Sequence, residues 1–165
     1  MSEDAVKTLV QAFISCRLDY CNSLYYGISD ELMTRLQSVQ NAAARLVSGA
    51  RRYDHITPVL RQLHWLPVRQ RVEFKVVTFV HRSLSRDAPS YIADDCRLVA
   101  DVAERRLRSA DTRLCIVART HSRFGDRTFA AAGTKLWNSL PANIRLPDLT
   151  FVGFRRAVKT LLFRQ

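Results

Sequence analysis

The stretch SDELMTRLQSVQNAAARLVSG, residues 29–49, decides the fold class of this chain. Ser29 or Asp30 can cap the start of a helix, and Gly49 is a typical helix stop. Between them, apolar residues recur at the three- and four-residue spacing of one helical face. The expected apolar stripe consists of Leu32, Leu36, Val39, Ala43, Leu46 and Val47. The stretch therefore predicts an amphipathic helix that buries this stripe.

The segments on either side are also amphipathic. A helix over residues 2–18 is expected to bury Val6, Leu9, Val10, Phe13, Ile14 and Leu18. Because Gly27 ends that segment shortly before residue 29, the first two helices should pack antiparallel. Downstream, caps, prolines and apolar spacing predict further helices. These cover residues 58–63, 68–85, 90–97, 126–140 and 150–162, with Thr57, Asp126 and Thr150 as expected caps.

The helical spacing weakens between Val99 and Phe124. Residues 112–117 have strand character, and a second short strand could run to Phe124. We therefore expect a small β-hairpin or irregular arm in the 104–124 region. The predicted fold class is mainly α, an antiparallel helical bundle with this hairpin or arm attached.

Positive charge is the strongest global feature. Lys and Arg total 26 against 15 Asp and Glu, a net charge of +11, and 22 of the 26 are arginines. Residues 32–86 carry a net charge of +8 and residues 102–165 one of +9, with −3 over residues 87–101 between them. The guanidinium fork matches phosphate oxygens and stacks on bases, so the pattern favours two nucleic-acid contact surfaces. Codon bias in a GC-rich genome is the alternative explanation for the arginine excess.

Other site chemistry is not indicated by the sequence. The cysteines (Cys16, Cys21, Cys96, Cys115) form no Cys-x-x-Cys pair, and no His lies at ligand spacing, so no zinc site or other cofactor is expected. The acidic start does not read as a signal peptide, and no apolar run is long enough for a membrane span. We expect a cytoplasmic or nuclear protein that is not secreted and has no membrane partner.

One stretch resembles a catalytic motif. Residues 91–95, Tyr-Ile-Ala-Asp-Asp, are similar to the Tyr-Ala-Asp-Asp box whose aspartates hold metal ions in reverse transcriptases. An extra Ile92 interrupts the box, and Pro89 places it at the start of a helix instead of a strand turn. We therefore expect Asp94 and Asp95 to be non-catalytic.

Several stretches in a fixed order resemble one known family. They are RLDYCNSL (17–24), VQNAAARLV (39–47), DHITPVL (54–60), LHWLPV (63–68), APSY (88–91), FGDR (124–127) and LWNSLP (136–141). The set is similar to the region that follows the polymerase palm in non-LTR (LINE-type, jockey-like) retrotransposon reverse transcriptases. The resemblance covers about Ala5 to Phe163.

The resemblance implies that the catalytic palm lies upstream, so the chain would not be an enzyme on its own. It also implies a thumb-like helical hairpin over residues 1–50 that holds the template–product duplex. A helical connector with a long basic helix would follow over 51–103, and a C-terminal arm with helices over 104–165.

We accordingly expect a non-catalytic fragment that binds RNA or an RNA–DNA duplex through Arg-rich faces. Tyr53, on the connector after Arg51 and Arg52, could stack on a base. The candidate contacts are Arg45, Arg51, Arg52, Arg69, Arg71, Lys75, Arg127, Arg155, Arg156 and Lys159. The alternatives are a protein-interaction piece that packs on the rest of a reverse transcriptase, and a non-functional transposon relic.

Overall fold

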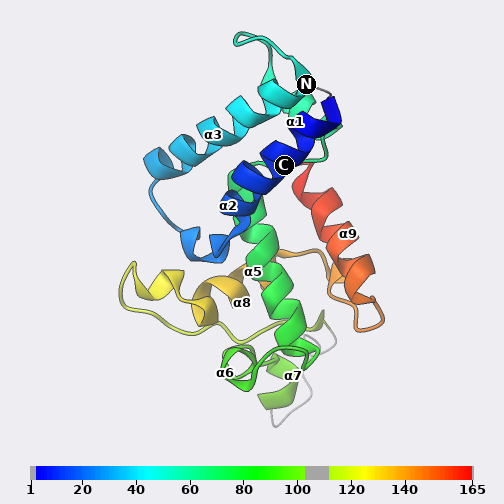
Figure 1. The fold of residues 1–165 in the computed structure, drawn as a ribbon. Helices are drawn as coiled ribbons and strands as arrows, with labels where there is room; N and C mark the ends of the chain where they lie inside the picture. Colours follow the sequence, from blue (N-terminus) through cyan, green and yellow to red (C-terminus); the bar gives the residue numbers. More distant parts are fainter. Residues whose placement is uncertain (1–2, 103–111, 165) are drawn as a thin grey trace. The chain divides into compact units, whose positions relative to one another are not determined.

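The computed structural model describes residues 3–102 and 112–164. Most of these residues are helical, as the apolar spacing predicts (Figure 1). Regular strands are missing from the described residues, where Leu98 and Cys115 form an isolated antiparallel bridge. The chain is therefore mainly α.

Helical segments follow one another along most of the described chain, and the longest interval between described elements lies between Val102 and Gly125. In chain order they are α1 (Glu3–Val10), a π-helical segment (Gln11–Ser15), α2 (Cys16–Asp19), a 3-10 turn (Asn22–Tyr25), α3 (Asp30–Ser48), α4 (Ile56–Gln62), α5 (Val68–Leu84), α6 (Ser90–Ala93), α7 (Val99–Val102), a 3-10 turn (Gly125–Arg127), α8 (Phe129–Ser139), a 3-10 turn (Ala142–Ile144) and α9 (Phe151–Leu162).

The chain divides into two compact units within α5. Residues up to Val72 form the first unit, and Glu73–Arg164 form the second. The segment boundaries expected after residues 50 and 103 remain a prediction. A bundle that unites the whole chain remains a prediction, and each unit is described by itself below.

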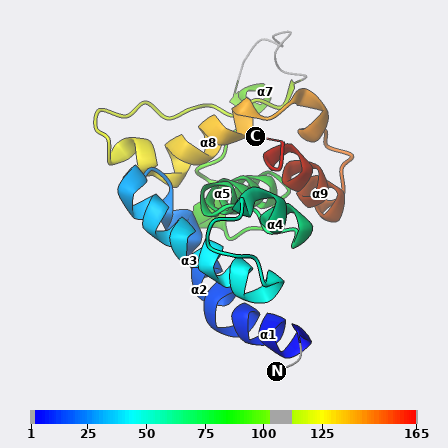
Figure 2. The same ribbon diagram turned by 90° about the horizontal axis from the view of Figure 1, so that it is seen from above.

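In the first unit, α1 and α3 run in opposite directions and pack together (Figures 1 and 2). Val10 of α1 forms a buried cluster with Ala43 and Val47 of α3. The apolar stripe expected on the first helix was partly wrong, because Leu9 and Phe13 are exposed. The π-helical segment explains the exposure of Phe13, since its wider turn places Ser15 instead on the buried face after Val10. Leu9 precedes this segment and lies beside the buried face of α1.

The buried face of α3 also differs from the expected stripe. Gly49 ends the helix with φ of 69°, as predicted for a left-handed cap. Ala43 and Val47 are buried as expected, but three residues of the predicted stripe are exposed. These are Leu32, Val39 and Leu46.

Amide hydrogen bonds explain why α3 buries a different face from the one that its apolar residues predict. Gln40 is buried, and its Nε2 donates to the carbonyl oxygen of Leu66 at 2.8 Å. The backbone N–H of Val68 donates to Oε1 of Gln37 at 2.8 Å. Periodicity that counts only apolar residues cannot identify a satisfied amide as part of the core.

In the second unit, helices α5, α8 and α9 surround a common core. Val80 of α5, Trp137 of α8 and Phe154 of α9 are almost fully buried. The imidazole of His81 stacks on Phe154 with ring centroids 4.2 Å apart. Thr150 caps α9 as predicted, because its Oγ1 accepts the N–H of Gly153 at 3.1 Å.

Two expected helix starts were wrong in detail. Helix α4 begins at Ile56, one residue before its expected cap, Thr57. Asp126 does not cap the next helix, because residues 125–127 form a 3-10 turn and Thr128 precedes α8.

The predicted β-hairpin is not confirmed. Residues 104–111 lie outside the described residues, and the described part, residues 112–124, contains only the bridge at Cys115. Helix α8 and the turn after it hold this irregular stretch. Asn138 exchanges two 2.8 Å hydrogen bonds with the backbone of Cys115, and Arg145 donates to the carbonyl of Thr112 at 2.7 Å.

Candidate nucleic-acid interface

Two of the predicted contact residues form ion pairs in the first unit. Arg71 binds Asp19 at 2.7 Å and the carbonyl oxygen of Leu66 at 3.0 Å, and only 14% of its side chain is exposed. Arg69 forms an ion pair with Asp30 at the start of α3. Both guanidinium groups therefore hold α5 to earlier parts of the chain, which leaves Arg71 little room to reach a phosphate.

The connector between α3 and α4 is built around Arg45. Its guanidinium donates to the carbonyl oxygens of Arg51 and Asp54, at 3.2 and 3.4 Å. The carboxylate of Asp54 in turn accepts the N–H of Arg51 at 2.7 Å. Arg51, Arg52 and Tyr53 are exposed on this turn, with an Arg51 to Tyr53 hydroxyl contact of 3.4 Å. Arg45 thus shapes the turn, and the turn presents the other three residues to solvent.

Two cations of α9 in the second unit lie next to aromatic rings. The Arg155 guanidinium lies 5.7 Å from the ring centroids of both Phe74 and Phe151. One turn later, the Lys159 ammonium lies 5.8 Å from the ring of Phe163. We call this set of residues the α9 surface: Phe74, Phe151, Arg155, Lys159 and Phe163.

The α9 surface combines features that suit a polyanion. No acidic residue occurs in the α9 sequence, and Arg156 adds a further exposed cation beside Arg155. Lys75 of α5 lies 5.5 Å from the ring of Phe79, so the same pairing recurs on α5. The sequence identified these cations as candidate contacts but gave no role to the phenylalanines beside them. The i, i+4 spacing of Phe151 and Arg155, and of Lys159 and Phe163, is the signal that could have revealed the pattern.

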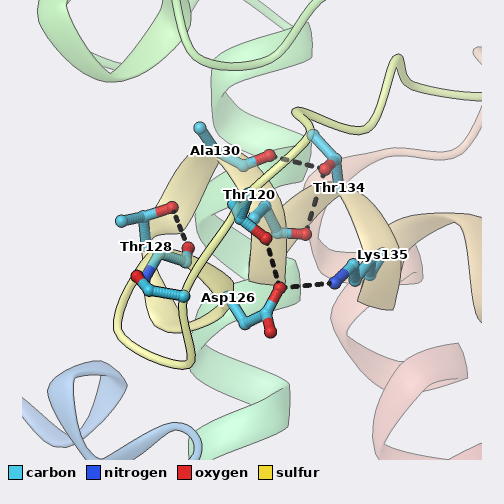
Figure 3. Close-up of polar contacts among 9 residues, drawn as sticks. Thr120, Asp126, Thr128, Ala130, Thr134 and Lys135 are labelled. Atoms are coloured by element: carbon cyan, nitrogen blue, oxygen red, sulfur yellow. Dashed lines mark hydrogen bonds and ion pairs between the residues drawn. The ribbon is translucent and has the colours of Figure 1, made fainter.

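Arg127, the remaining predicted contact, lies in a turn that is fastened to α8. Figure 3 shows the Asp126 carboxylate between Thr120 and Lys135. Its Oδ1 accepts a hydrogen bond from the Thr120 hydroxyl and forms a 3.2 Å ion pair with Lys135 Nζ. These two partners lower the pKa of Asp126, the Thr120 hydrogen bond contributing most. The carboxylate is therefore a structural link, with Arg127 exposed next to it.

The aspartates of the stretch that resembles a catalytic box lie just after a short helix. Asp94 and Asp95 are exposed in the turn that follows α6. Within the described residues, no three His, Cys, Asp or Glu side chains come together in a group that could hold a metal ion. None of the described helices has the length and apolarity needed to cross a membrane.

The buried cysteines are poor nucleophiles. Burial raises the pKa of Cys96 to about 11 and that of Cys115 to about 12. Because the thiolate is the reactive form, both groups stay protonated and unreactive near neutral pH. Their place beside the bridge of Leu98 and Cys115 makes them packing residues.

Comparison with known proteins adds no assignment: no protein-family model matches the chain, and no curated protein or solved structure is significantly similar to it.

Proposed function

We propose that this chain is a non-catalytic, nucleic-acid-binding piece of a non-LTR retrotransposon reverse transcriptase. The observation that supports binding is the α9 surface, where two cations are held against three phenylalanine rings. The parent enzyme enters this proposal only through the sequence resemblance. The ligand would be RNA or an RNA–DNA duplex.

The geometry of Arg155 favours phosphate binding. Its planar group lies 5.7 Å from each of two ring centroids, and these contacts restrict the side chain without consuming its N–H donors. A guanidinium restricted in this way loses less conformational entropy when it binds a phosphate. Lys159, one helical turn away, supplies a second charge along the same face. Contacts of this kind to the backbone would be independent of sequence.

The first unit would serve as a thumb-like antiparallel hairpin within a larger helical bundle. Its direct contacts would come from the connector residues Arg51 and Arg52. Arg45, Arg69 and Arg71 would support the fold, because their guanidinium groups already bind carbonyl or carboxylate oxygens.

A salt titration of the double variant Arg155→Ala/Lys159→Ala tests the proposal. Each phosphate contact contributes about 0.7 to 0.9 to the slope of log affinity against log salt. Losing both contacts should flatten the slope by roughly 1.4 to 1.8 units for RNA and DNA of any sequence. A charge-matched control, Arg35→Ala/Arg61→Ala, removes exposed cations from α3 and α4 and should change the slope less. Equal slopes for the parent and the α9 variant would remove the basis of the proposal.

A second candidate function, packing on another protein, is favoured by the exposed face of α3. Leu32, Val39 and Leu46 recur every seven residues and are 47%, 48% and 65% exposed. A row of this kind suits a partner helix. The Leu46→Glu variant would then weaken binding to a separately supplied polymerase core and leave the affinity for RNA unchanged.

A further inference from the structure

The most exposed large apolar side chain described in the chain is Phe124, at 81%. It belongs to the turn between the irregular arm and α8, which was not expected to carry an aromatic contact. A single exposed apolar side chain is common on protein surfaces, so the Phe124 ring becomes a candidate contact only together with the fixed turn that carries it and the arginines beside it.

The turn that carries Phe124 is held by several contacts. Thr120 and Lys135 both bind the carboxylate of Asp126 (Figure 3). The Ser122 hydroxyl accepts the N–H of Gly125 at 3.1 Å. A Cβ at Gly125 would meet the Cβ of Thr120 at 3.1 Å, so Thr120 would have to move by a few tenths of an ångström to admit a side chain there. The backbone on both sides of Phe124 is therefore fixed before any ligand binds.

The charges around this ring are positive. Arg119 and Arg123 are exposed in the same segment, and Arg127 follows Phe124 by three residues. The acidic residue of the segment, Asp126, is occupied by its two partners. An exposed ring among cations offers a stacking partner for a base and neutralising groups for the adjoining phosphates.

We propose that residues 119–127, which we call the Phe124 loop, bind unpaired nucleotides of a single strand, with one base stacked on Phe124. A base inside a duplex is already stacked on its neighbours, so the ring selects single-stranded over double-stranded nucleic acid. This inference rests on the proposed function and adds to it a second, structure-selective site.

The Phe124 loop is separate from the α9 surface. Within the second unit, the loop lies on one side of α5 and α9 on the other, in both Figure 1 and Figure 2. A variant in the loop therefore changes strand preference without altering the phosphate contacts at Arg155 and Lys159.

Fluorescence anisotropy with two labelled probes tests the inference. The probes are single-stranded oligo(U) RNA and a blunt RNA duplex of equal charge. Phe124→Ala should weaken oligo(U) binding by roughly 5- to 150-fold, the range for loss of one base–aromatic stack, and leave duplex binding unchanged. Phe124→Trp should retain the affinity and show quenching of the added indole on binding. The matched control is Tyr91→Ala, which removes another exposed ring of the same unit and should affect neither probe.

The outcomes separate this inference from the proposed function. If the parent bound neither probe, both would fail. If the parent bound both probes and Phe124→Ala changed the two affinities equally or not at all, only the Phe124 loop assignment would be overturned. Phe124-dependent binding to phosphatidylserine-containing vesicles, without any effect on oligo(U), would assign the ring to a membrane surface and likewise overturn it.

Asp126→Asn supplies a second test that leaves the ring in place. This substitution weakens the hydrogen bond to Thr120 and removes the ion pair with Lys135. Because Asp126 is exposed, the protein should still fold. Because the loss of a negative charge by itself favours a polyanion, the measure is the cost of losing the ring. Phe124→Ala added to this variant should weaken oligo(U) binding less than it does in the parent. Independent, fully multiplicative effects would contradict a fixed ring position.

Discussion

Trp137 donates a 2.7 Å hydrogen bond from Nε1 to the carbonyl oxygen of Arg113, 24 residues earlier in the chain. Together with the pair of bonds between Asn138 and Cys115, it attaches the irregular arm to α8. The LWNSLP stretch thus has a structural role, because its Trp and Asn side chains form hydrogen bonds with the backbone of the arm.

Trp137→Phe should destabilise the protein by more than the lost apolar area alone. The ring still fills the core, but the carbonyl of Arg113 loses its partner in a partly buried place, at a cost of about 1–3 kcal/mol. Trp65→Phe is the control, because the Trp65 indole is only half-buried. Urea denaturation followed by circular dichroism measures both. Equal losses from the two substitutions would argue against a stabilising role for the Arg113 bond.

Leu36 and Leu46 provide a second comparison, since both lie on the stripe expected for α3. Leu36 packs against the buried cluster of Met33, Val68 and Val72, whereas Leu46 is 65% exposed. Leu36→Asp should cost several kcal/mol, because a carboxylate next to this cluster loses solvent without gaining a partner. Leu46→Asp should stay within about 0.5 kcal/mol, as surface substitutions usually do. Similar melting temperatures for the two variants would contradict the observed orientation of α3.

The stability of the second unit should depend on the protonation of His81. Burial lowers the pKa of His81, Arg113 lowers it further, and Asp87 opposes the shift. Its Nδ1 atom also has no hydrogen-bond partner among the described residues. Above about pH 6.5 the imidazole is neutral in both the folded and the unfolded chain, so its protonation does not change the free energy of unfolding. Below that pH the unfolded chain takes up the proton first, so stability is lost as pH falls toward the lower, folded-state pKa.

His81→Phe should remove this contribution while keeping a ring beside Phe154. Thermal melts between pH 7.5 and 5 would measure it, and the variant should lose less stability than the parent over this interval. Carboxylates contribute equally to both curves, so the difference between the curves reports His81. Parallel curves would show that the folded protein accepts the proton without penalty.

Features set by neighbouring residues could be predicted from the sequence, whereas contacts between distant residues could not. The helix ends at Gly49 and Thr150 were predicted correctly, because each cap depends only on residues next to it in the sequence. The sequence did not predict which face of α3 is buried, because the amide of Gln40 on that face binds Leu66, 26 residues away. At the candidate interface, local sequence showed which cations exist but not which ones bind carboxylates. Nothing in the order of residues indicates that Arg71 faces Asp19, 52 residues apart.

The connector after α3 allows a sharp test of phosphate contacts in the first unit. Arg51 and Arg52 are exposed, and Arg45 holds the turn that presents them. If both contact phosphates, replacing them with alanine should flatten the salt slope by about one to two units on any sequence. Arg69→Ala/Arg71→Ala removes the same charge but takes guanidinium groups from ion pairs with Asp30 and Asp19.

This second double variant should lower thermal stability and leave the salt slope closer to that of the parent. Both proteins should therefore be compared at a temperature where circular dichroism shows them fully folded. An unchanged slope for Arg51→Ala/Arg52→Ala would make the connector a solvated turn or a docking patch for another protein. A larger change in the salt slope for Arg69→Ala/Arg71→Ala would mean that nucleic acid displaces the carboxylate partners of these arginines. The interface would then include the start of α5.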